Sequence, residues 1–224
     1  HHGGPDTVEE KAWLEQVAQA HGRPDPIVPF CAINQAGVAA QLDRHLAASP
    51  RLRGVRLRRH PADPDTAAFH RGLAALEARG LSYELDASPG DLLAGRATAR
   101  AHPGLQVIVG HAGFPLQRDA EYFRRWQVEM AALAEVDNVA CKISGLGMAD
   151  HPWTVASLRP WVLHCLEVFG LERSMFGTDW PLDILFGTYL EQVDAYRVIL
   201  AQAGLSREEQ ARLLAGNAER LYRI

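Results

Sequence analysis

Cysteine is scarce in this sequence of 224 residues, which contains only Cys31, Cys141 and Cys165 and no Cys-x-x-Cys spacing. An odd and sparse set of this kind excludes a disulfide framework. Reduced thiols are typical of the cytoplasm, whereas disulfide-rich folds belong to oxidising compartments. The first four residues, His-His-Gly-Gly, lack the charged and apolar regions of a signal peptide. We therefore expect a cytoplasmic protein.

The sequence also lacks an excess of positive charge and a long apolar run. Its formal net charge is -4, which leaves no basic field to hold a polyanion, so we expect no nucleic-acid partner. The longest apolar runs, such as residues 107–109, are too short to cross a bilayer, so we expect no membrane partner. Hydrophobic residues make up 47% and charged residues 22%, a balance typical of a globular protein and not of a disordered one.

Three common catalytic and nucleotide-binding motifs are absent. The sequence contains no Gly-x-Gly-x-x-Gly segment after a strand, no Gly-x-x-x-x-Gly-Lys segment and no Gly-x-Ser-x-Gly segment. The first two cradle phosphates, so nucleotide cofactors have no support. The third carries the nucleophile of serine hydrolases on α/β sheets, and that class is also unsupported.

Short apolar segments alternate with longer segments in which Leu and Ala recur at helical spacing. We predict strands at residues 27–33, 54–57, 82–85, 107–110, 139–143 and 174–176. We predict helices at residues 7–20, 36–48, 67–79, 123–134, 155–169 and 189–203. Strands that alternate with helices, without a low-complexity linker, indicate parallel βα units in a single α/β domain.

The number of predicted strands bears on how the sheet closes. A closed (β/α)₈ barrel has eight strands, whereas six also fit an open doubly wound sheet. However, the helix at residues 7–20 has no strand before it, and a barrel without two strands would expose two edges. We therefore predict an α/β fold of the (β/α)₈ TIM-barrel class, a single domain over residues 1–224 that lacks one or two N-terminal βα units.

Two of the predicted strands end in residues that can carry chemistry. The strand at 107–110 leads into His111, an imidazole suited to bind a metal or move protons near neutral pH. A hydrogen bond to a loop carbonyl is the structural alternative. The strand at 174–176 leads to Asp179, whose carboxylate is suited to be a metal ligand or general base in a partly desolvated mouth. Capping of the next helix is the alternative, although Asp183 is a rival cap.

Further polar side chains accompany these two on the predicted strands. Lys142 and Ser144 point to the same face of one strand, opposite to Cys141 and Ile143. A lysine at such a place could bind a substrate carboxylate, stabilise an oxyanion or hold Asp179, or it could form a structural salt bridge. The candidate substrate-binding residues are Arg56, Asp86, Ser144 and Trp180, because the guanidinium of Arg56 suits an acidic substrate and the others lie at strand ends.

Four segments, taken in order, resemble the amidohydrolase-related family of metal-dependent hydrolases, in its lactonase-like branch. They are HAGFP at residues 111–115, CKISGLG at 141–147, MFGTDWP at 175–181 and GNAERLYRI at 216–224. The resemblance implies a distorted barrel with its site at the C-terminal ends of the strands. It implies that His111 binds a metal or polarises the substrate, that Asp179 activates water and contacts the metal, and that Arg56 holds a substrate carboxylate.

The sequence departs from this family at two places. Relatives carry a His-x-His pair on the first strand, and no such pair occurs in this sequence. His111 and Asp179 alone are fewer ligands than a catalytic zinc normally has. Relatives also commonly follow the arginine with a histidine, where this sequence has Leu57. We expect a divalent metal, zinc or manganese, but whether the reaction needs it is open.

We predict a lactone hydrolase that opens a sugar lactone or a carboxylate-bearing lactone. Asp179 is expected to act as base on water, while His111, any metal and Lys142 stabilise charge on the carbonyl oxygen. Two alternatives stay open: a metal-dependent, non-oxidative decarboxylase of an aromatic or muconate-type acid, and a non-catalytic binding or assembly subunit. The expected partner is a small acidic molecule, and assembly into a homo-oligomer is left open.

Overall fold

Parallel βα units make up most of the chain in a computed structural model, which describes residues 7–57, 59–61, 63–151 and 153–224. Within these residues the strands are β1 (Gly54–Arg56), β2 (Ser82–Leu85), β3 (Val107–Val109), β4 (Val139–Ile143) and β5 (Ser174–Phe176). The helices are α1 (Thr7–His21), α2 (Val38–Ala48), α3 (Ala67–Glu77), α4 (Leu92–Ala101), α5 (Ala120–Ala134), α6 (Val155–Phe169), α7 (Tyr189–Gln202), α8 (Arg207–Ala211) and α9 (Asn217–Tyr222). None of the described helices is long and apolar enough to span a membrane.

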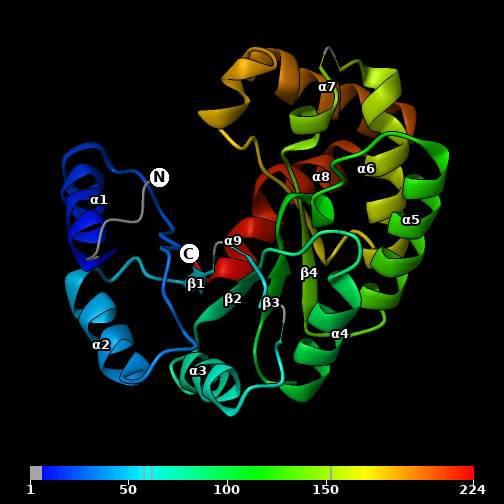
Figure 1. The fold of residues 1–224 in the computed structure, drawn as a ribbon. Helices are drawn as coiled ribbons and strands as arrows, with labels where there is room; N and C mark the ends of the chain where they lie inside the picture. Colours follow the sequence, from blue (N-terminus) through cyan, green and yellow to red (C-terminus); the bar gives the residue numbers. More distant parts are fainter. Residues whose placement is uncertain (1–6, 58, 62, 152) are drawn as a thin grey trace.

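The strands form one parallel sheet in the order β1-β2-β3-β4-β5, so each strand pairs with its neighbour in the sequence. Helices α3 to α6 follow one another around this sheet, as Figure 1 shows. Sequential pairing with helical crossovers is the pattern of a barrel, because each unit adds to the same edge. It also brings the carboxyl ends of all these strands to one end of the molecule.

Side chains from the two faces of the sheet enter different apolar clusters. Val107, Val109 and Cys141 belong to the large core beneath the helices. Ile108 and Ala140 face the other way and pack with Tyr222 of α9. This alternation is the period of two that a strand imposes, and it confirms that Cys141 and Ile143 lie on the helix-covered face.

The prediction of a strand at residues 27–33 is wrong, because this segment is not a strand of the sheet. This segment makes two isolated parallel bridges, Ile27 with Leu52 and Phe30 with Arg56. Pro29 lies between them and has no N–H to donate to a ladder, which explains why the pairing is interrupted. The carbonyl of Pro29 still accepts a hydrogen bond from Arg56 N–H at 3.0 Å, so the segment lies beside β1.

The predicted helices form, and the structure adds others. The helix predicted at 123–134 begins earlier, as α5, because the Asp119 side chain caps the backbone N–H groups of Glu121 and Tyr122. Helix α4 and the C-terminal helices α8 and α9 were not among the predicted ranges. The buried side chain of Asn217 ties α9 to the sheet by donating to the carbonyls of Leu171, at 2.6 Å, and Ser174, at 2.7 Å.

The loop after β1 is held by a buried histidine. His60 is 2% exposed, and its ring shares hydrogen bonds with Tyr83 Oη at 3.2 Å and Thr98 Oγ1 at 3.4 Å. Its backbone N–H donates to the carbonyl of Asp86 at 2.7 Å, which connects this loop to the end of β2. Burial lowers the pKa of His60 from 6.5 to about 4, although the charge of Asp91 opposes this shift.

The depressed pKa of His60 predicts that folding stability falls as the pH is lowered from 6.5 toward 4. The unfolded chain binds the proton more readily than the folded chain in that window, so acid favours unfolding by up to about 3 kcal/mol. We expect His60→Gln to remove most of this loss, measured as the free energy of urea unfolding at both ends of the window. The exposed His151→Gln is the control, and an equal pH dependence in wild type and His60→Gln would contradict the assignment.

Candidate active site

A pocket of about 780 Å³ opens at the carboxyl ends of the strands. Its polar lining comes from Arg56, Asp86, His111 and Asp179. Its apolar lining comes from Phe114, Met148, Trp180, Pro181, Leu182, Ile184 and Leu185. The strand ends of an α/β barrel are where catalytic side chains gather, and a concave apolar pocket with a few convergent polar groups is the usual form of a small-molecule site.

His111 follows β3 after a single residue, Gly110, and lies in a tight turn where its backbone has a φ of 48°. Its ring shares a hydrogen bond with Ser144 Oγ through Nδ1 at 3.0 Å. A Cβ on Gly145 would lie 2.7 Å from that same nitrogen, so the glycine leaves room for the imidazole. Burial, and next the charge of Lys142, lowers the pKa of His111 to about 4. The imidazole is therefore neutral near neutral pH and donates a single N–H.

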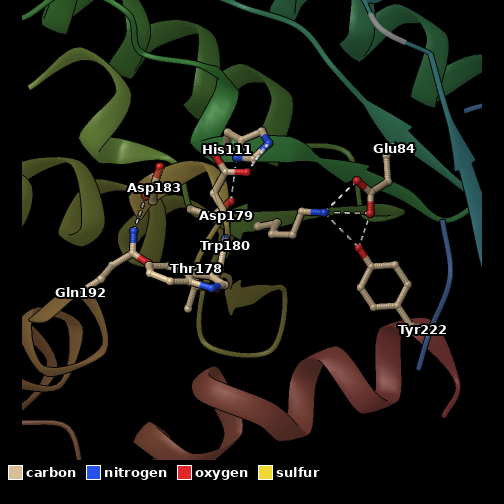
Figure 2. Close-up of polar contacts among 10 residues, drawn as sticks. Glu84, His111, Thr178, Asp179, Trp180, Asp183, Gln192 and Tyr222 are labelled. Atoms are coloured by element: carbon tan, nitrogen blue, oxygen red, sulfur yellow. Dashed lines mark hydrogen bonds and ion pairs between the residues drawn. The ribbon is translucent and has the colours of Figure 1, made fainter. Parts of the chain in front are cut away.

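Asp179 follows β5 and also has a left-handed backbone, with a φ of 54°. Its Oδ1 lies 3.8 Å from His111 Nε2. Figure 2 shows the two side chains facing each other. Its Oδ2 is buried and has no hydrogen-bond donor among the described residues. Burial, and next the charge of Asp183, raises the pKa of Asp179 to about 6. A carboxyl group with a raised pKa and an oxygen that lacks a hydrogen-bond donor is suited to proton transfer.

Neither aspartate of this loop caps the helix that follows. Helix α7 is capped by Thr188 in a capping box with Glu191. Asp183 instead lies in a short 3-10 turn, Leu182–Leu185, where it is 4% exposed and accepts a hydrogen bond from the Gln192 side chain. The capping alternative for Asp179 is therefore not what the structure shows.

Lys142 lies on the face opposite to the helix-covered core, as predicted, but its ammonium is directed to Glu84. The Nζ atom lies 2.8 and 2.7 Å from the two carboxylate oxygens of Glu84 and 3.4 Å from Tyr222 Oη. Figure 2 shows Glu84 and Tyr222 of this network to one side of the pair of His111 and Asp179. Lys142 does not line the described pocket, so the geometry favours the salt-bridge alternative. Its charge still contributes to the lowered pKa of His111, and it opposes the rise in the pKa of Asp179.

The other predicted site residues divide into two groups. Arg56, Asp86 and Trp180 line the pocket, as expected for residues that contact a substrate. Burial raises the pKa of Asp86 to about 6, while the charge of Arg56 opposes this. Ser144 is 1% exposed and shares a hydrogen bond with His111. It is not among the residues that line the pocket, so the structure does not place it where a substrate contact was predicted. Gln192 was not predicted, because a helical glutamine carries no signal of this kind.

The described residues do not complete a metal site. Residues 7–224, apart from 58, 62 and 152, contain no group of three His, Cys, Asp or Glu side chains placed to hold an ion. His111 and Asp179 supply two ligands, and a catalytic zinc normally has three protein ligands. The predicted pair is therefore brought together, but it does not by itself fit a zinc or manganese centre.

Comparison with known proteins gives this geometry a context. An uncharacterized protein, y4mH, from Sinorhizobium fredii is 34% identical over 96% of this chain and 75% of its own length. An L-fucono-1,5-lactonase from Burkholderia ambifaria is 30% identical over 97% of this chain and 77% of its own length. A crystal structure of an amidohydrolase from Burkholderia multivorans with bound zinc is 28% identical, covers 96% of this chain and 79% of that chain, and superposes with a TM-score of 0.86.

The solved amidohydrolases that superpose on this chain are TIM barrels, which confirms the predicted fold class. The amidohydrolase family profile matches residues 6–224, and so covers nearly the whole chain. The four segments that suggested the resemblance all lie within this range. The chain therefore belongs to the amidohydrolase family.

Proposed function

We propose that this protein hydrolyses a lactone, with Asp179 as the base that activates water. The observation that carries the proposal is the approach of Asp179 Oδ1 to His111 Nε2, at 3.8 Å, in a pocket at the strand ends. The relative named an L-fucono-1,5-lactonase supports the choice of a lactone over other substrates of hydrolases. The bound zinc of the superposed amidohydrolase makes a metal worth testing, but no step below depends on one.

The carboxylate of Asp179 is assigned the first step. A water that donates to this carboxylate loses its proton to it, while the oxygen of the water attacks the carbonyl carbon of the lactone. Because the pKa of Asp179 is raised to about 6, the carboxylate is ionised near neutral pH and still basic enough to take the proton. The ring C–O bond then breaks, and the proton passes from Asp179 to the departing ring oxygen.

His111 is assigned the role of stabilising the negative charge that develops on the carbonyl oxygen. If Ser144 donates its O–H to Nδ1, the proton of the neutral imidazole resides on Nε2, which is the nitrogen that faces Asp179. That N–H can donate to the carbonyl oxygen as it becomes negative. Ser144 and Gly145 thus act through His111, one by fixing the tautomer and the other by giving the ring space.

Arg56 supports a substrate that carries a carboxylate. Its side chain reaches the same pocket as His111 and Asp179, and a guanidinium binds carboxylates through two parallel hydrogen bonds. Trp180 and the apolar residues after it form the other wall, against which the ring of the substrate can pack. We therefore propose a small acidic lactone as the substrate class.

The role of Asp179 predicts that Asp179→Asn loses activity without losing its fold. Asparagine keeps the shape of the side chain but cannot accept the proton of water, so we expect kcat to fall by about 10²- to 10⁴-fold. Lactone opening is measured by the acid that it releases, and thermal unfolding shows whether the variant is folded. Asp194→Asn is the matched control, because Asp194 is an exposed carboxylate of α7.

Unchanged lactone opening in Asp179→Asn would contradict the assignment. Release of CO₂ from an aromatic or muconate-type acid, with lactones inert, would favour the decarboxylase alternative. The absence of both activities would favour a protein that binds its ligand without turnover.

The role of Arg56 predicts a change in substrate preference. We expect Arg56→Met to raise KM for a carboxylate-bearing lactone by about tenfold or more, because a charge-assisted hydrogen bond contributes about 1.5–3 kcal/mol. KM for a neutral lactone of the same ring size should change little. Arg59→Met, at an exposed residue outside the described pocket, is the control. Equal effects on the two lactones would show that Arg56 does not bind the carboxylate.

A further inference from the structure

The 3-10 turn at Leu182–Leu185 exposes its apolar side chains and buries its polar one. Leu182, Ile184 and Leu185 are 52%, 60% and 72% exposed, whereas Asp183, between them, is 4% exposed. This is the reverse of the usual arrangement, in which apolar side chains are buried and carboxylates face water. Large apolar side chains that are exposed together, and not singly, are typical of a surface that binds another molecule.

Contacts on the buried side of the turn hold it in this orientation. The Asp183 carboxylate accepts a hydrogen bond from the side chain of Gln192 on α7, as Figure 2 shows. The backbone N–H groups of Asp183 and Ile184 donate to the carbonyls of Asp179 and Pro181, each at 3.2 Å. Because these bonds fix the polar side chain inward, its apolar neighbours are left at the surface.

The exposed side chains of the turn belong to the candidate active site. Leu182, Ile184 and Leu185 line the same pocket as His111 and Asp179. A leucine or isoleucine side chain has no hydrogen-bonding group, so the three offer nothing to the hydroxyl groups of a sugar ring. A hydrocarbon group that packs against them, in contrast, removes apolar surface from water on both sides of the contact, which is favourable.

The size of the pocket leaves space for such a group. Its volume of about 780 Å³ lies in the range of sites for drug-sized ligands. A lactone ring with one carboxylate is smaller than such a ligand. The pocket can therefore hold a further substituent of the ring, and the side chains of the turn define the chemistry of that substituent.

We propose that the lactone opened by this protein carries an apolar substituent, an alkyl or aryl group, which packs against Leu182, Ile184 and Leu185. The inference rests on the proposed lactone hydrolysis and narrows its substrate class. His111 and Asp179 act on the ester group, while the turn binds the hydrocarbon. Because a contact with a remote substituent is the same before and during the reaction, it lowers KM and leaves kcat unchanged.

The test is the dependence of KM on the length of the substituent. The substrates are γ-lactones that all carry one carboxylate on the ring and differ only at the carbon bonded to the ring oxygen, which bears hydrogen, methyl, propyl or pentyl. We expect KM to fall by about two- to fourfold for each carbon added, at nearly constant kcat, because each methylene is buried wholly or on one side. A KM that does not fall with chain length would overturn the proposal.

Leu185→Gln tests where the substituent binds. Glutamine is similar in size but polar, so we expect the ratio of KM for the unsubstituted lactone to KM for the pentyl lactone to fall by about three- to tenfold. Leu185 is largely exposed, so the variant should fold. Leu190→Gln is the matched control and should keep the wild-type ratio, because Leu190 is 70% exposed on α7 and does not line the described pocket. Equal ratios in wild type and Leu185→Gln would overturn the role of the turn.

A second copy of the chain is the other molecule that these exposed side chains can bind. Analytical ultracentrifugation of wild type and Leu185→Gln detects this case. Self-association that Leu185→Gln abolishes, together with a KM that is independent of chain length, would assign the turn to a contact between copies and overturn the proposal.

These outcomes differ from those that test the proposed function. A wild-type protein that opens none of the lactones removes the proposed function, and this inference with it. A wild type that depends on Asp179, and yet has the same KM for every substituent or prefers a polyhydroxylated lactone of the same ring size, removes only the apolar substituent.

Discussion

The parallel register of the sheet is the constraint on which the candidate site depends. β3 and β5 are not neighbours, because β4 lies between them. The carboxyl ends of all three nevertheless meet at one end of the sheet, so His111, Ser144 and Asp179 converge although they are far apart in the sequence. Ser144, after the middle strand, connects to the imidazole. The register thus places Ser144 on one nitrogen of the imidazole, Nδ1, and Asp179 near the other, Nε2.

Burial acts on these two groups in opposite directions. It lowers the pKa of His111, because the imidazolium is the charged form, and it raises the pKa of Asp179, because the carboxylate is the charged form. The result is a neutral hydrogen-bond donor beside a carboxylate of increased basicity. Lys142, which forms a salt bridge with Glu84, acts on these two groups without lining the described pocket. Its charge adds to the lowering of the His111 pKa and opposes the rise of the Asp179 pKa.

Sequence reasoning located the five strands of the sheet and predicted two residues, His111 and Asp179, that the structure brings together, because both predictions depend on local patterns. Short apolar runs followed by a polar residue are visible along the chain, and His111 and Asp179 each follow such a run. The segment at 27–33 has the same apolar character, but Pro29 interrupts its pairing. The ion pair of Lys142 with Glu84 joins different strands, so its partner could not be chosen from the sequence. Likewise, the contact of Asp183 with Gln192 depends on how α7 packs over the loop.

The most direct test of the account is a crystal structure of the protein with a lactam in place of the lactone. The ring nitrogen makes such an analogue resistant to hydrolysis, so the bound geometry can be observed. We expect its carbonyl oxygen within hydrogen-bonding distance of His111 Nε2 and a water between its carbonyl carbon and Asp179. A lactam bound elsewhere, or His111 and Asp179 side chains that do not share one pocket, would contradict the account.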